Sequence, residues 1–294
     1  MPLRIFNNLN SSIAQNRLGT NNRDLGESIS RVASGDRLTG SGASATDKSI
    51  SELLNSDSRA LRQAARNLND GIGLINIAEG ALNEQTGALI RIREILSAAD
   101  GATPDLVRET LQIEINTLKD EFNRIASSTD FNGQNILDGS LAASVEGPEH
   151  VVILIGINSD ESGRIDLNEV VNLGSTDSSS LGLDDLSVAT FQEAIEGLAS
   201  VDKALEDIIS FRASIGATQN RFTRALSNLN ISIENLNAAS SVIKDADFAE
   251  EVTDLTRRQL LVQSSAAMVG QANLIPEAQI QLVSATLTVV KKVN

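Results

Sequence analysis

Few side chains in this sequence could carry nucleophilic, acid–base or metal chemistry. The chain of 294 residues contains one histidine, His150, and no cysteine. A zinc site needs several His or Cys ligands, and no second such residue exists to complete one. Ser-His-Asp catalysis would have to use His150, and no strained Gly-x-Ser-x-Gly elbow is present. We therefore interpret His150 as a surface-loop residue.

The remaining candidates are clustered carboxylates near residue 250, namely Asp245, Asp247, Glu250 and Glu251. They are placed on a predicted amphipathic helix, which favours a solvated face or salt bridges between subunits over catalysis. The sequence has neither a Walker-type phosphate loop nor a dinucleotide fingerprint. We expect no enzyme activity, no catalytic residues, no cofactor and no metal site.

Composition limits the other classes of function. The net charge is −15 and the sequence pI is near 4.5. An acidic surface repels phosphate backbones, so nucleic-acid binding is not expected. No apolar stretch of about 18 residues could span a membrane, and the first ten residues lack the features of a cleaved signal peptide. Aromatic residues make up only 2%, which favours long, narrow helical packing over a thick core.

Hydrophobic periodicity predicts a mainly α protein with long antiparallel coiled-coil helices. The strongest pattern is an apolar residue at every seventh position, at Leu54, Leu61, Leu68, Ile75, Leu82, Leu89 and Leu96. Gly101 and Pro104 end this helix, and a second helix with an apolar face from Leu111 to Ile125 follows as its antiparallel neighbour. A third long helix is predicted from Val201 to Ile243.

A small β-hairpin region separates the second and third long helices, at about residues 130–175. The run Val151–Ile155 has the composition of a strand, and Arg164–Leu167 is predicted as its partner. The Ser/Thr-rich loop at residues 175–180 then leads into the last helical half.

Each end of the chain carries a thin apolar stripe that cannot stabilise an isolated helix. The stripes either pack on the core of the same chain or wait for other copies of the protein. The residues predicted to pack in these terminal helices are Ile5, Leu9, Ile13, Leu18, Leu25, Leu255, Val262, Val269, Ile280 and Leu287.

Several short blocks, in order along nearly the whole chain, resemble bacterial flagellins. The N-terminal block Ile29–Leu38 is similar to the family's helix end at Ser-Gly-x-Arg-Ile/Leu. Further blocks are residues 67–72, 78–82, 91–96, the Phe131-Asn132-Gly133 turn, residues 243–251, and Gln271–Asn273 with Pro276. Several blocks at consistent separations make this resemblance specific.

The resemblance implies paired N- and C-terminal helices in an inner domain, residues 1–42 with 245–294, and a helical shell, residues 43–244. About 60 residues separate the second and third long helices, so we expect a short form without the variable outer domain. The implied function is a structural subunit that is exported unfolded through the flagellar type III system and polymerises into the extracellular filament for motility. Implied partners are copies of itself, cap and hook-associated junction proteins, and an export chaperone at the C-terminal helix.

Two departures from the family pattern concern the ends of the shell and of the chain. Residues 39–47 lack the paired Asp that often follows the Arg-Ile step, and the C-terminus runs past the usual stop to Asn294. In many flagellins an Arg-x-Arg-Glu segment is read by an innate immune receptor. The matching positions, Arg91, Ile95 and Glu114, serve either that receptor or contacts between protofilaments.

Two other interpretations remain open from the sequence. A hook-filament junction adaptor shares the terminal helices, although the blocks between residues 67 and 133 favour a flagellin. A secreted coiled-coil effector that binds membranes should contain a strongly apolar segment, and none is present.

Overall fold

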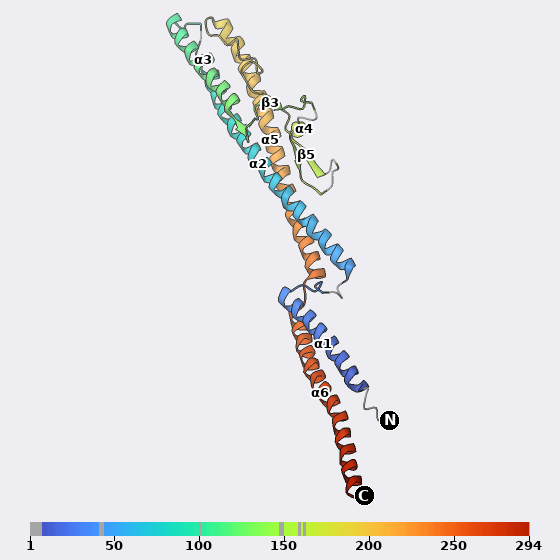
Figure 1. Cartoon of the computed structure of the whole chain (residues 1–294). Coiled ribbons are helices and arrows are strands. Elements are labelled where there is room, and N and C mark those ends of the chain that lie inside the picture. The colour runs from blue at the N-terminus through green and yellow to red at the C-terminus, as the bar shows by residue number, and fades with distance from the viewer. Residues whose placement is uncertain are drawn as a thin grey trace. The chain divides into compact units, whose positions relative to one another are not determined.

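The computed structural model describes residues 8–40, 44–99, 101–146, 150–157, 160 and 163–293, without the side chains of 275, 279, 282, 283 and 285–293. Its long helices are α1 (Leu9–Ser34), α2 (Ala45–Ala98), α3 (Asp105–Ser128), α5 (Phe191–Lys244) and α6 (Phe248–Val293). Figure 1 shows them as extended rods, with the short strands gathered beside α2 and α5. The prediction of a mainly α fold with long helices and a small β region is confirmed.

The chain divides into two compact units, Met1–Asn55 with Leu236–Asn294 and Ser56–Asn235. We call these the terminal unit and the central unit. The predicted division into residues 1–42 with 245–294 and residues 43–244 rests on the family resemblance and stays a prediction.

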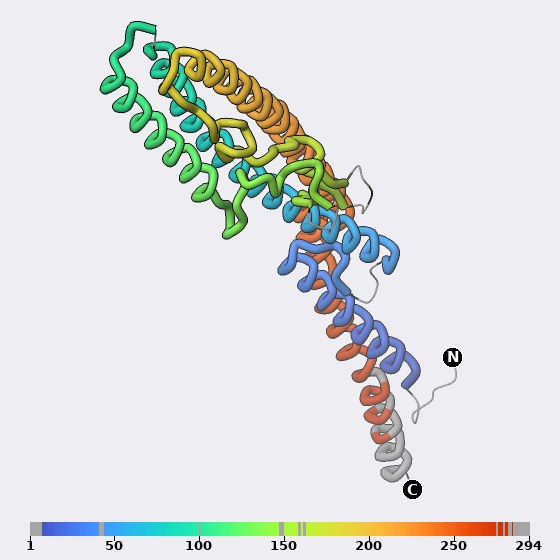
Figure 2. Tube along the Cα trace, turned by 90° about the horizontal axis from the view of Figure 1, so that it is seen from above, coloured from blue at the N-terminus to red at the C-terminus, as the bar shows by residue number. Residues whose placement is uncertain are grey.

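The central unit is held together by α3 and α5 lying antiparallel to α2 (Figure 1 and Figure 2). Between α2 and α3, Arg91 pairs with Glu114 and the Gln85 amide donates to the carbonyl of Phe122. Between α2 and α5, Arg93 pairs with Asp202. Glu79 of α2 pairs with Arg212, further along α5, so the contacts between α2 and each partner run in opposite chain directions. The short turn that follows α2 predicts this arrangement for α3.

The predicted heptad residues form the core of this unit. Leu61, Leu68, Ile75, Leu82, Leu89 and Leu96 are buried, and they meet buried residues of α3 and α5 that include Phe122 and Phe222. The helix begins at Ala45, several residues before the heptad pattern suggests. The physical reason is Ser44, whose hydroxyl accepts a hydrogen bond from the backbone N–H of Asp47 as an N-cap.

The β region consists of three antiparallel pairs. The predicted hairpin is present as β4 (Val152–Leu154) with β5 (Arg164–Asp166), in the register Ile153 to Ile165. β1 (Asp130–Phe131) and β2 (Gln134–Asn135) close over Asn132 and Gly133, both with positive φ, as a two-residue hairpin turn requires. β3 (Asp138–Leu141) pairs with β6 (Leu173–Ser175), and the one-turn helix α4 (Leu167–Val170) follows β5.

The segment after β6 is irregular chain that is nevertheless part of the core. Thr176, Leu181, Leu183, Leu186 and Val188 are all buried. The sequence interpretation treats residues 175–180 only as a loop into the last helix and misses this packing.

In the terminal unit, α6 is much longer than the short terminal segment expected from the sequence. It spans 46 residues and continues through Pro276. The carboxylates Asp245 and Asp247 were predicted on a helix, but they lie in the break between α5 and α6. Asp247 accepts hydrogen bonds from the N–H groups of Ala249 and Glu250, so it is the N-cap that starts α6.

Candidate functional site

The candidate site is the pair of terminal helices, because it holds most of the residues that the sequence predicts to be functional. α1 and α6 lie side by side and antiparallel (Figure 1). The Asn8 amide donates to the carbonyl of Ala272 at 2.8 Å, and the Asn21 amide donates to the Ser265 hydroxyl at 2.6 Å. Residues nearer the end of α1 therefore contact residues nearer the start of α6.

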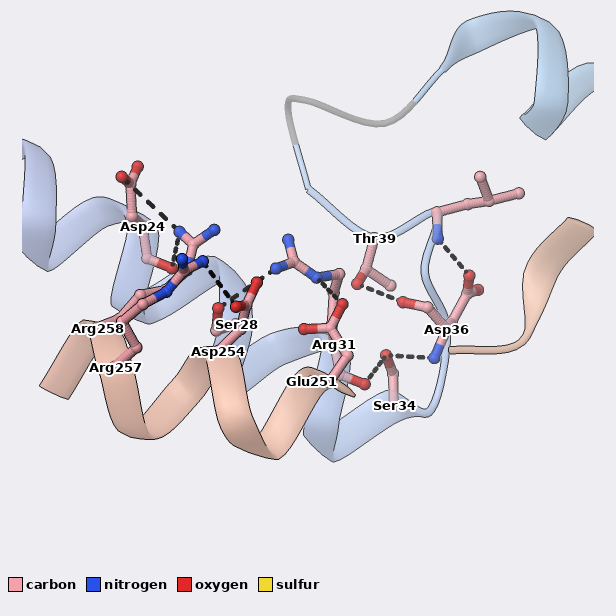
Figure 3. Close-up of polar contacts among 11 residues, drawn as sticks. Asp24, Ser28, Arg31, Ser34, Asp36, Thr39, Glu251, Asp254, Arg257 and Arg258 are labelled. Carbon is pink, nitrogen blue, oxygen red and sulfur yellow. Dashed lines mark hydrogen bonds and ion pairs between the residues drawn. The ribbon is translucent and has the colours of Figure 1, made fainter. Parts of the chain in front are cut away.

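The most enclosed ion pair of the site joins Arg31 of α1 to Glu251 of α6 (Figure 3). Arg31 Nε lies 2.8 Å from Glu251 Oε1, and the two side chains are only 15% and 14% exposed. Arg31 Nη2 also donates to the hydroxyl of Ser28, which is completely buried. A guanidinium group and a hydroxyl group of α1 therefore meet a carboxylate group of α6 between the two helices.

A second arginine continues this polar contact along α6. Arg258 Nη1 donates to the backbone carbonyl of Asp24 at 2.9 Å and lies 3.7 Å from its carboxylate (Figure 3). Hydrogen bonding is incomplete here, because Glu251 Oε2 and Arg258 Nε are buried atoms for which the described residues supply no partner. A buried polar atom without a partner costs free energy, so this interface is not optimised for stability.

The junction that follows α1 is fastened to the junction that precedes α6. Gly35 ends α1 in the left-handed conformation, at φ 68°, and its carbonyl accepts from the N–H of Ala246. Asp36 and Asp245 form a single antiparallel β-bridge, and Arg37 donates to the carbonyl of Ile243. These backbone contacts, together with the Arg37 side chain, fix one end of the α1 and α6 pair.

The apolar residues predicted to pack in the terminal helices are unevenly covered. Leu18, Leu25, Leu255, Val262 and Val269 are half-buried.

Three others are exposed to solvent: Leu9 by 70%, Ile13 by 51% and Ile280 by 53%. Ile5 and the side chain of Leu287 lie outside the described residues. Packing of these residues in the terminal helices therefore stays a prediction.

The pattern of burial in this pair is the reverse of that in an ordinary helix interface, where large apolar side chains are buried and polar ones are exposed. The buried residues of α1 are Ser11 and Ser28, and Ala272 is the one buried hydrophobic residue in the described part of α6. Larger apolar side chains of the pair face solvent, including Ile29, Leu260, Leu261 and Met268. An exposed apolar stripe on two paired helices is typical of a surface that another protein covers.

An open groove runs along this surface between the two helices. Its apolar lining comes from Ile13 and Ala14 of α1 and from Met268 and Ala272 of α6. Because Ile13 and Met268 are both more than half exposed, the groove offers apolar contact area to a neighbouring side chain.

The sequence interpretation missed the polar residues between the helices, although the sequence contains a signal for them. Glu251, Arg258, Ser265 and Ala272 recur every seventh residue on α6, and Asn21 and Ser28 have the same spacing on α1. We call the contacts made at these positions the polar layers. They alternate at three- and four-residue spacing with Leu18, Leu25, Leu255, Val262 and Val269, as the two core positions of a heptad do.

The second predicted surface is only partly assembled. Arg91 Nη2 lies 2.7 Å from Glu114 Oε1, and hydrogen bonds to Glu114 and then Glu94 raise the pKa of the exposed Arg91 guanidinium. Ile95 is only 2% exposed, because it belongs to the core. The structure therefore brings Arg91 and Glu114 together at the surface and leaves Ile95 beneath them.

His150 is more enclosed than the sequence interpretation of a surface-loop residue suggests. Its side chain is 11% exposed, Nδ1 lies 2.6 Å from Asp166 Oδ2, and Nε2 lies 3.0 Å from the carbonyl of Val145. Both ring nitrogens face oxygen acceptors, so the hydrogen bonds that the imidazole donates to the Asp166 carboxylate and to the Val145 carbonyl raise the pKa of His150. This arrangement ties β5 to the residue 145 turn.

The parts of the chain that the structure describes hold neither a metal-binding cluster nor a membrane-spanning helix. No group of three or more His, Cys, Asp or Glu residues there could hold a metal ion. Among the same residues, no helix combines the length and apolar character needed to cross a bilayer.

Comparison with known proteins gives matches over nearly the whole chain. Residues 5–142 match the model of the bacterial flagellin N-terminal helical region, and residues 198–283 match that of the bacterial flagellin C-terminal helical region. The flagellar filament 30.7 kDa core protein of Treponema maltophilum is 37% identical over 283 residues, covering 95% of this chain and 99% of that protein. The flagellin of Bacillus subtilis is 34% identical over 302 residues, with the same two coverages.

Solved structures that resemble this chain in fold include one with a TM-score above 0.5. A Vibrio parahaemolyticus protein of the flagellar hook-associated class superimposes with a TM-score of 0.55 at 16% identity, covering 67% of this chain and 97% of that one. At this identity the likeness concerns the fold alone.

Proposed function

Since this chain belongs to the bacterial flagellin family and is a structural subunit of the flagellar filament, we propose that its paired terminal helices are the surface through which copies join. Flagellins are extracellular structural proteins, and the chain is not an enzyme. Its match to relatives of similar length shows a short form without a variable outer domain.

The observation that carries the proposal is the inverted burial of α1 and α6. Leu9, Ile13, Met268 and Ile280 are each more than half exposed in the single chain, while the buried positions are small or polar. Exposed apolar side chains gain about 25 cal/mol for each Å² that a neighbouring copy covers. Head-to-tail contacts that do not close into a ring extend into an open helical polymer, which is the geometry of a filament.

The same balance supports export of the chain in an unfolded form. Ordering costs roughly 1–2 kcal/mol of backbone entropy per residue, and a thin, polar-layered interface offsets little of it. We infer that the terminal helices remain largely unfolded before assembly, pass through the type III export channel without a cleaved signal peptide, and fold on joining the filament.

Several partners follow from this proposal. An export chaperone that binds the C-terminal helix would cover exposed residues of α6 such as Leu260 and Leu261 before export. Cap proteins and hook-associated junction proteins would contact the same terminal surface at the two ends of the filament. The inner domain would comprise residues 1–42 with 245–294, and the shell residues 43–244.

The junction-adaptor alternative is less well supported. The curated relatives that match along their whole length are filament proteins, with 34% and 37% identity in the two reported above. The hook-associated protein shares the fold at 16% identity, which does not distinguish an adaptor from a filament subunit.

Recognition by an innate immune receptor at Arg91, Ile95 and Glu114 also stays a prediction. Arg91 and Glu114 present a paired charge at the surface, whereas Ile95 would require the helices to separate before it could be contacted. Reporter cells treated with purified monomer would test this prediction, with an Arg91→Ala variant as the matched comparison.

Two variants test the assembly surface. Deleting residues 1–25 should leave the central unit folded and abolish polymerisation onto filament seeds. The milder change of Leu9 and Ile13 to Ser should alter monomer stability by no more than about 0.5 kcal/mol, because both side chains are exposed, yet impair polymerisation.

Circular dichroism melting reports the central unit, and light scattering with electron microscopy reports filament growth. The unmodified chain must elongate the seeds. Filaments formed by the truncated chain would contradict the proposal, and so would normal growth of the Ser variant.

A further inference from the structure

We propose that the polar layers between α1 and α6 select the register of the terminal pair, with Arg31 and Glu251 as the residues that determine it. The inference deepens the proposed function and rests on it, because a register matters only if the pair assembles into filaments. It assigns these residues a positioning role in assembly.

The polar layers occupy repeating positions. On α6, Glu251, Arg258 and Ser265 follow one another at seven-residue intervals. Their partners on α1 are Arg31, the carbonyl of Asp24 and Asn21, which succeed one another in the opposite direction. Each layer therefore contains a different donor and acceptor pair.

The apolar layers cannot select a register by themselves. They are built from Leu18 and Leu25 on α1 and from Leu255, Val262 and Val269 on α6. Hydrophobic contact is non-directional, so sliding one helix by a heptad replaces one aliphatic contact with another of similar size. Apart from the contacts at the junction, two antiparallel helices with such a repeat would have several registers of comparable stability.

The charges distinguish these registers. In the observed register Arg31 meets Glu251, with both side chains largely enclosed. A slip of one heptad in one direction would place Arg31 opposite Arg258, and a slip in the other direction would place Asp24 opposite Glu251. Both neighbouring registers therefore juxtapose like charges, which is the repulsive element that specificity requires.

Incomplete hydrogen bonding supports a role in selection. Glu251 Oε2 and Arg258 Nε are buried without partners among the described residues. Enclosed ion pairs of this kind contribute little net stability compared with apolar side chains of the same volume, but polar core positions can fix register. The layers thus specify one pairing while keeping it weak enough to form only during assembly.

Charge reversal provides the test. Arg31→Glu should raise the critical concentration for seeded polymerisation by about tenfold or more, and so should Glu251→Arg, because each leaves like charges facing in the observed register. The double variant Arg31→Glu/Glu251→Arg restores the pair and should polymerise close to the unmodified chain. Rescue by exchange of the two charges is not expected if each residue contributes only to local folding.

A matched control is Arg124→Glu on α3, which lowers the net charge by the same amount as Arg31→Glu but lies outside the terminal helices. Arg124 is 62% exposed and pairs with Glu121 of the same helix, so polymerisation should resemble that of the unmodified chain. The central unit should melt nearly identically in all variants, because substitutions of exposed surface residues change stability very little.

The outcomes separate this inference from the proposed function. Failure of the unmodified chain to elongate seeds would overturn the proposed function. If that chain elongates, then normal growth of Arg31→Glu, absence of rescue in the double variant, or an equal block by Arg124→Glu would each overturn the register assignment alone.

Discussion

Gly71 of α2 offers a sharp test of how the β4–β5 hairpin is seated on the helical core. A Cβ atom at this position would overlap with Ile153 Cδ1 and would lie 3.0 Å from Phe222 Cε2. Both approaches are closer than ordinary van der Waals contacts, so Gly71→Ala forces β4 or its side chain to move. Gly80 lies in the same helix, and a Cβ there would meet nothing within 4 Å.

Two opposing terms set the expected magnitude. Replacing glycine by alanine inside a helix stabilises it by about 1 kcal/mol, and this gain should apply at both positions. Overpacking of a filled core costs about 1–3 kcal/mol and should apply at Gly71 alone. Gly80→Ala should therefore gain about 1 kcal/mol, whereas Gly71→Ala should range from neutral to about 2 kcal/mol destabilised.

A second substitution identifies the atom responsible. Ile153→Val removes Cδ1, the closest atom to the added methyl, and leaves Cγ1 at 3.6 Å. Gly71→Ala should therefore be tolerated better in the Ile153→Val background than in the unmodified chain. The contact with Phe222 remains, so the recovery should be incomplete.

Urea unfolding followed by circular dichroism gives the free energies of unfolding for the four chains of this cycle and for Gly80→Ala. The difference between the two alanine variants isolates the overpacking term. Equal stabilisation by Gly71→Ala and Gly80→Ala would refute the reasoning, since it would mean that the hairpin does not press on α2 at Gly71. An unchanged cost in the Ile153→Val background would show that Cδ1 is not the obstacle.

Two pH-dependent predictions concern the β region and the segment after it. Hydroxyl groups of Ser179 and Ser180 lower the pKa of Asp177 from 3.8 to about 2, so its stabilisation is present above the higher value and is lost as pH falls toward the lower one. In the Asp177→Asn variant, the free energy of unfolding should therefore fall less steeply with decreasing pH over that interval. The pKa of His150 is raised, so its stabilisation is present below the ordinary value of 6.5 and is lost as pH rises through the folded value. His150→Gln should lower the melting temperature most in mild acid. In the unmodified chain, NMR titration of the single imidazole should give a pKa above the ordinary value.

The central helices could be predicted from the sequence because one periodic pattern determines both their structure and their burial. An apolar residue at every seventh position from Leu61 to Leu96 is compatible with a coiled coil, and a coiled coil buries those positions. The β4–β5 hairpin was also predictable, since an aliphatic run and a segment of alternating polar and apolar residues flank turn residues.

Irregular parts of the central unit could not be predicted in this way. Leu181, Leu183, Leu186 and Val188 are buried by long-range contacts in a segment with neither helical nor strand geometry. His150 is enclosed because its side chain contacts Asp166, which lies sixteen residues further along the chain, across the hairpin. No local pattern reports a contact of either kind.

The terminal helices show a different limit of sequence reasoning. Their period identifies the positions on one face, but it does not say whether that face meets the same chain or another copy. Leu18 and Leu255 are half-buried within the pair, while Leu9 and Ile280 remain exposed. Under the proposed function, the half-buried residues contact the same chain and the exposed ones contact other copies. A stripe this thin would then leave the pair marginal in isolation, and neighbouring subunits would complete it by covering the exposed residues.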